Sequence, residues 1–157
     1  GTYLPASGLV FVCAGRNIGL KNVSQLQKAF QRLSEAHPGI SLDTRLLPPE
    51  EHGKRLAQAY AVVVSSFSEV CSNTAIDAVS LGKPFICPKD TGTGERLGEC
   101  GLFVDTRSEV ALTQAFESLL DPIVYQQLAT AAQSFSFTHS WEEMAEEIIR
   151  ALKARNL

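Results

Sequence analysis

Two cations follow the first apolar run of the sequence, in the stretch GRNIGLKN (15–22). Arg16 offers a planar fork of hydrogen-bond donors, and Lys21 offers a mobile point charge. A helical pattern begins directly after them, and a helix N-terminus adds backbone amides and a positive dipole end. Together these features suit a diphosphate, although two solvated loop charges would give the same pattern. The stretch is not G-x-G-x-x-G, so the dinucleotide-binding fingerprint is absent.

Two carboxylates lie in and after the loop that follows the third apolar run. Glu69 lies in the loop, and Asp77 falls in the first turns of the helix expected over 72–82. Carboxylates accept hydrogen bonds from sugar hydroxyls. On one continuous helix they would lie about 12 Å apart, whereas a bend before the helix would bring them to two ends of one ligand. Spacing alone favours the simpler interpretation of a loop charge and a helix-dipole partner.

A glycine-containing stretch, TGTGE (91–95), follows the fourth apolar run. Gly92 and Gly94 would let the backbone approach a ligand closely, and their amides could form an anion nest. Glu95 is expected to open the next short helix. A plain flexible turn explains the stretch about as well.

Histidines and C-terminal aromatic residues give no further signal of catalysis. His37, His52 and His139 are scattered over helix ends and loops, and no nucleophile pairs with any of them. We therefore interpret all three as surface or capping residues. The aromatic residues near the C-terminus are expected to pack rather than bind a ligand; they are Phe135, Phe137 and Trp141.

The elements that must position these residues alternate along the chain. Short continuous apolar runs are typical of strands buried on both faces, and apolar residues at three- and four-residue steps indicate amphipathic helices. This order predicts an α/β fold with a parallel sheet covered on both faces, whose ligands bind outside the carboxyl ends of the strands. We expect strands at 8–14, 40–47, 61–66, 84–88 and 101–105. We expect helices at 22–37, 48–60, 72–82, 107–120, 122–135 and 140–154.

Size and composition bound the classes of function. The chain has 157 residues, of which 45% are hydrophobic and 20% charged, with a net charge of -3. These values predict one domain over 1–157, with a linker at 1–7 and C-terminal helices over 107–157. The absence of a long basic run argues against nucleic acid as a partner. No apolar stretch approaches the ~20 residues that span a bilayer, so an integral membrane protein is not expected.

The four cysteines are Cys13, Cys71, Cys87 and Cys100, and their spacings fit no zinc template. Cys13 and Cys87 lie in apolar runs, where reduced cysteine is a common core residue. We therefore expect no metal site and a reducing, cytoplasmic compartment.

Three segments, taken in order, resemble a known family. They are FVCAGRNIGLKNVSQLQKAF (11–30), VVVSSFSEVCSNTAIDAVSLGKPFIC (62–87) and TGTGERLGECGLFVD (91–105). They are similar to the "GR…KG", "E-G-F-G-x-x-x-x-E-A-x-x-x-G-x-P" and "GG-x-x-E…G-L-L-V-D" segments of the C-terminal, donor-binding domain of retaining GT-B glycosyltransferases of the group 1 type. The resemblance implies a Rossmann-like, three-layer α/β/α domain with a mostly parallel sheet of about five to six strands.

The resemblance also implies roles for individual residues. Arg16 and Lys21 would bind the donor diphosphate and stabilise negative charge on the leaving nucleotide, and Glu69 would contact the transferred sugar. Asp77 would hold the ribose hydroxyls. The rest of the implied nucleotide-sugar site comprises Cys71, Ser72, Asn73, Gly92, Thr93, Gly94 and Glu95. Such enzymes resemble one another in using no metal or cofactor, with the nucleotide sugar as substrate and with retention at the anomeric carbon.

Several residues depart from the family pattern. Asp77 replaces a Glu, Val70 and Ser72 replace both glycines of E-G-F-G, and Asn22 replaces the glycine of K-G. The donor pocket is therefore expected to be reshaped, or activity lost. The resemblance covers only the donor-binding half, so we expect weak nucleotide-sugar binding and no turnover without an acceptor-binding domain, supplied in cis or in trans. Surface left exposed between the domains would also allow a homodimer.

Three other interpretations remain open. A nucleotide-sugar epimerase fragment of GT-B fold would need acidic and histidine catalytic residues that we cannot assign. A non-catalytic nucleotide-sugar-binding or scaffold module is favoured by the missing glycines. A flavodoxin-like regulator would need an acidic cluster after the first strand, where the sequence has Arg16.

Overall fold

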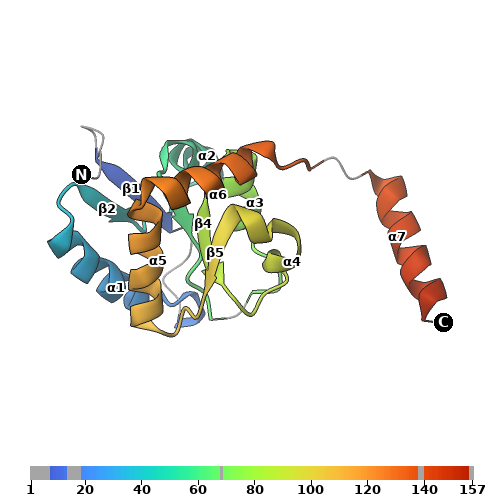
Figure 1. The fold of residues 1–157 in the computed structure, drawn as a ribbon, viewed down its shortest axis with the longest axis horizontal. Coiled ribbons are helices and arrows are strands. Elements are labelled where there is room, and N and C mark those ends of the chain that lie inside the picture. Colours follow the sequence, from blue (N-terminus) through green and yellow to red (C-terminus); the bar gives the residue numbers. More distant parts are fainter. Residues whose placement is uncertain (1–7, 14–18, 68, 138–139, 156–157) are drawn as a thin grey trace.

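A computed structural model describes residues 8–13, 19–67, 69–137 and 140–155. Within them, five parallel strands form one sheet in the order β2-β1-β3-β4-β5, with helices on both faces (Figure 1). The strands are β1 Leu9–Cys13, β2 Ile40–Asp43, β3 Ala61–Val63, β4 Phe85–Pro88 and β5 Gly101–Val104. The helices are η1 Gly19–Lys21, α1 Val23–Ala36, α2 Pro49–Gln58, α3 Asn73–Ser80, α4 Thr93–Leu97, η2 Gly98–Cys100, α5 Glu109–Leu120, α6 Pro122–Ser134 and α7 Trp141–Ala154. The predicted α/β class and parallel sheet are confirmed.

Alternate residues of each inner strand face opposite layers, which explains their continuous apolar runs. Phe11 packs toward α1 and α5, where its ring meets those of Phe30 and Phe116 edge-to-face. Val12, the next residue along β1, packs on the other face in a cluster to which α2 and α3 contribute. The sheet is thus rigidly held between two apolar layers, and the loops at its carboxyl edge rest on a fixed base.

Several expected elements differ from those observed, among them the strand expected over 61–66, which ends at Val63. The strand expected over 40–47 ends at Asp43, because the Asp43 carboxylate accepts hydrogen bonds from the backbone and side chain of Arg45 and turns the chain out of the sheet. The glycine-containing loop expected over 91–95 is largely helical, since α4 begins at Thr93. None of the described helices is both long and apolar enough to cross a lipid bilayer.

The C-terminal helix α7 lies to one side of the domain (Figure 1). It begins with a capping box in which Ser140 and Glu143 exchange hydrogen bonds, but none of its residues is buried. Trp141 is 83% exposed, so the expectation that it packs is wrong for the described chain. An ion pair of 3.7 Å between Arg96 and Glu147 links α7 to α4.

Candidate functional site

Lys21 is the last residue of η1 and directly precedes the N-cap of α1. That N-cap, Asn22, has a left-handed backbone with φ 53°. The conformation explains why a glycine fits the family's K-G, and asparagine is among the few other residues that adopt it readily. The buried Asn22 side chain donates to the carbonyl of Thr106 over 2.7 Å. The departure from K-G therefore preserves the backbone path that presents Lys21.

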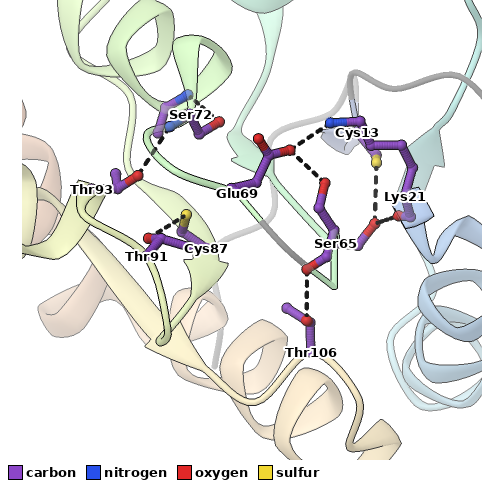
Figure 2. Close-up of polar contacts among 11 residues, drawn as sticks. Cys13, Lys21, Ser65, Glu69, Ser72, Cys87, Thr91, Thr93 and Thr106 are labelled. Atoms are coloured by element: carbon purple, nitrogen blue, oxygen red, sulfur yellow. Dashed lines mark hydrogen bonds and ion pairs between the residues drawn. The ribbon is translucent and has the colours of Figure 1, made fainter.

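Lys21 and Glu69 meet directly at the carboxyl edge of the sheet. The Lys21 ammonium lies 2.5 Å from a Glu69 carboxylate oxygen, which also accepts a 2.6 Å hydrogen bond from Ser66 (Figure 2). Burial raises the pKa of Glu69, but the hydrogen bonds from Lys21 and Ser66 outweigh burial and the pKa is lowered. The Lys21 side chain is 35% exposed and that of Glu69 18%, so a ligand can reach the pair from solvent.

Three loops are joined beneath this pair. The Ser65 hydroxyl donates to the carbonyl of Lys21 over 2.6 Å, which ties the loop after β3 to the loop after β1. The buried Thr106, after β5, donates to the carbonyl of Ser66 over 3.0 Å. Backbone carbonyls are thus held in place by hydroxyls on both sides, and the two charged groups above them have a defined position.

The N-terminus of α3 lies next to Glu69, as Figure 2 shows at Ser72. Ser72 caps the helix by accepting from the amide of Ala75 over 3.3 Å. Its own amide donates to the hydroxyl of the buried Thr93 over 3.0 Å. First-turn amides of a helix have no acceptor within the helix, so those that begin at Asn73 add positive potential here. The serine that replaces a family glycine therefore acts as a helix cap and a link to α4.

Gly92 has a structural explanation that differs from the expected one. Its φ is −67°, so it needs no glycine-specific conformation. Instead, a Cβ at Gly92 would lie 3.0 Å from the carbonyl oxygen of Val70, to which the Gly92 amide donates over 2.8 Å. Close approach of two chain segments accounts for this glycine, and Gly94 lies in the first turn of α4.

The remaining predicted site residues lie in the loop before α3, on α3 and on α4, outside the Lys21–Glu69 pair. Cys71 is exposed in the loop before α3, and Asp77 is exposed on α3 itself. Because α3 begins only at Asn73, Glu69 and Asp77 are not on one helix. Glu95 is exposed on α4 and lines a cavity of about 510 Å³ formed with η2 and the end of α6. Arg16 lies outside the described residues.

Sequence reasoning missed a second polar cluster, which joins the end of β2 to α2. The Arg55 guanidinium, only 8% exposed, donates to Asp43 over 3.2 Å and to His52 Nδ1 over 3.2 Å. Hydrogen bonds from Arg45 lower the pKa of Asp43 to about 2. The pKa of His52 is lowered on balance. Burial and the Arg55 charge lower it, and together they outweigh the Asp77 carboxylate, which raises it. The sequence gives no clear signal for this cluster, because Arg55 lies in the polar helix segment PEEHGKRLAQ (49–58).

Within the described residues, no three His, Cys, Asp or Glu side chains gather in a way that would hold a metal ion. Positive groups at the carboxyl edge of the sheet include the Lys21 ammonium and the N-terminus of α3. Such groups stabilise a polyanion without a metal, and the adjoining carboxylates accept from hydroxyls. This arrangement can bind a molecule that carries phosphates at one part and hydroxyls at another.

The family model for glycosyl transferases group 1 matches residues 6–122. The chain therefore belongs to the group 1 glycosyltransferase family. A D-inositol 3-phosphate glycosyltransferase of Corynebacterium diphtheriae is 29% identical over 142 residues, which cover 88% of this chain and 33% of that protein. Its counterpart in Rhodococcus opacus is 33% identical over 122 residues, or 73% of this chain and 27% of that protein. The chain thus spans about a third of the length of the curated relatives it matches.

The fold agrees with this assignment. The catalytic domain of starch synthase IV from Arabidopsis thaliana, solved with ADP and acarbose, superimposes with a TM-score of 0.69 at 16% identity. The match covers 93% of this chain and 38% of that one. The resemblance to the GT-B fold inferred from three motifs is confirmed at the level of family and fold.

Proposed function

We propose that this chain is the donor-binding half of a retaining, metal-independent glycosyltransferase. The observation that carries the proposal is the Lys21–Glu69 pair at the carboxyl edge of the sheet, beside the N-terminus of α3. Lys21 and the helix amides would bind the diphosphate, and Glu69 would accept hydroxyls of the transferred sugar. Asp77, one turn into α3, would hold the ribose.

Donor binding then requires an exchange of partners. In the ligand-free chain the Lys21 ammonium is engaged by Glu69. A diphosphate carries more negative charge than one carboxylate and would draw Lys21 away, which releases Glu69 for the sugar. During transfer, Lys21 and the α3 amides face the charge that develops on the leaving nucleotide, where fixed positive groups lower the barrier. Arg16, on the same loop, is expected to share this role.

The acceptor half is the second requirement for turnover. We propose that it is supplied in cis or in trans and that this chain alone binds the donor weakly without transferring it. The apolar side chains of α7 support this proposal, because Ile148 and Ile149 are about half exposed and suit a partner surface. The same helix would serve a homodimer.

All four cysteines are free thiols, in keeping with a cytoplasmic location.

One observation favours a non-catalytic binding module instead. The Ser72 amide, at a position where the family has glycine, is already bonded to Thr93 and is not free for a phosphate. Such a module would bind nucleotide sugars but would stay inactive when the acceptor half is present. Activity of the joined halves separates the two alternatives.

Thermal unfolding with nucleoside diphosphates tests the proposal. UDP, GDP and ADP are each titrated into the chain, into Lys21→Met and into Lys28→Met, since Lys28 is an exposed lysine on α1. A ligand that binds only the folded chain raises its stability. We expect one nucleotide to stabilise the wild type and Lys28→Met, and to bind Lys21→Met about tenfold more weakly. No stabilisation by any of the three, or an equal effect in both variants, would overturn the proposal.

A further inference from the structure

His52 is held by a buried arginine rather than standing free on the surface. Arg55 donates to three acceptors: Asp43, the carbonyl of Arg45 and Nδ1 of His52. The Nε of Arg55 is buried and has no hydrogen-bond partner in the described chain. Burying a guanidinium is costly unless it is paired, and here Asp43 at the end of β2 supplies the charge. The cluster therefore fixes the position of the His52 ring.

The contact with Arg55 also fixes the proton of His52. An arginine side chain has only donors, so His52 Nδ1 must accept and carries no hydrogen. The neutral ring then has its proton on Nε2, which the ring geometry directs away from the buried guanidinium. His52 thus presents one oriented N–H donor at the surface, at a position set by the sheet.

The helix that carries His52 packs on the same face of the sheet as the helix that carries Asp77, the residue expected to hold the ribose. His52 is on α2 and Asp77 on α3, and both helices contribute to the apolar cluster that contains Leu56 and Ala78. The Asp77 carboxylate acts electrostatically on His52. A donor on one helix and a carboxylate acceptor on the other match a vicinal diol, in which one hydroxyl accepts while its neighbour donates.

We infer that His52 is a nucleoside-recognition residue whose Nε2–H donates to a ribose hydroxyl while Asp77 accepts from the other. Arg55 and Asp43 are positioning residues for this donor. The inference rests on the proposed function, because it places the ribose beside a diphosphate bound at Lys21. It adds the nucleoside contact on α2 and explains why a charged residue is buried beneath it.

The test compares each ribonucleotide with analogues that lack one hydroxyl. Dissociation constants are measured for UDP, GDP and ADP and for their 2′-deoxy and 3′-deoxy forms, with the wild type and with His52→Phe, His52→Gln and His37→Phe. Phenylalanine removes the donor, whereas the glutamine amide restores an N–H near Nε2. His37 ends α1 at the opposite edge of the sheet and is the matched control. The preference for ribose is a ratio, so it does not depend on the folded fraction of a variant.

We expect the wild type to prefer one ribonucleotide over a deoxy analogue, and His52→Phe to lower that preference about fivefold. His52→Gln should stay within about twofold of the wild type, and His37→Phe should match it. If the diphosphate binds through Lys21 but His52→Phe keeps both preferences, the inference fails and the proposed function stands. If none of the nucleotides binds, both fail.

Discussion

Lys21 and Glu69 form an ion pair in the ligand-free chain, and breaking this pair costs part of the free energy of ligand binding. A diphosphate must separate them before it gains Lys21. The Ser66 hydroxyl also donates to Glu69, so the carboxylate keeps a partner when Lys21 leaves. The site is thus built to exchange one ion pair for another rather than to expose an unpaired charge.

Replacing Glu69 with glutamine should separate the two parts of the donor site. Without the carboxylate, Lys21 is free, so a nucleoside diphosphate should bind roughly threefold more tightly. The sugar conjugate should lose its advantage over the diphosphate, because a carboxylate accepts hydroxyls more strongly than an amide. Calorimetric titration of both ligands measures the two effects. Weaker binding of the diphosphate in Glu69→Gln would contradict the exchange.

The backbone of Asn22 gives a prediction that needs no ligand. Asn22→Ala loses the hydrogen bond to Thr106, and alanine adopts φ 53° less readily than asparagine. The free energy of unfolding should therefore fall by about 2 kcal/mol. Asn22→Gly loses only the hydrogen bond and should cost about 1 kcal/mol. Urea unfolding compares them. An alanine variant as stable as the glycine variant would show that the left-handed turn is not required.

At the scale of elements, the spacing of apolar residues predicted the strands and helices. Parallel strands buried on both faces have continuous apolar runs, and amphipathic helices have apolar residues at three- and four-residue steps. It could not predict that the second strand ends at Asp43, because that end depends on a carboxylate meeting Arg45 and Arg55 across a turn and a helix. The short helix that was expected to open at Glu95 begins two residues earlier, at Thr93, and the prediction missed this because the glycines before Glu95 suggested a flexible loop.

The candidate site was predictable to a similar extent. Motif order brought Lys21 and Glu69 to one edge, and the structure places them in contact. The same motifs gave no sign of His52, because its role depends on a buried partner three residues later on the same helix. Whether these residues bind a donor stays a prediction.

Acid should weaken the link between β2 and α2. Hydrogen bonds from Arg45 lower the pKa of Asp43 from 3.8 to about 2. A lowered carboxyl pKa stabilises the folded chain above pH 4, and the stabilisation is lost as the pH falls from about 4 to 2. Arg45 is largely exposed, which limits the effect to about 1 kcal/mol. Chemical unfolding at several pH values in this range should show that the free energy of unfolding falls in the wild type and not in Asp43→Asn. An equal dependence of this free energy on pH in both proteins would contradict the prediction.

At the scale of the whole molecule, α7 adds little to the stability of the domain. It has no buried residue, and its ion pair with Arg96 is exposed on both sides. A chain that ends at Phe137 should therefore unfold within about 0.5 kcal/mol of the full chain. A loss above about 2 kcal/mol would show that α7 packs on the domain in solution.

The account as a whole depends on where the donor diphosphate lies. The most direct measurement is a crystal structure of the chain with whichever of UDP, GDP or ADP stabilises it, or with its sugar conjugate. We predict that the diphosphate lies between Lys21 and the N-terminus of α3, and that the Lys21–Glu69 ion pair is broken. A ligand bound elsewhere, with that ion pair intact, would contradict the account.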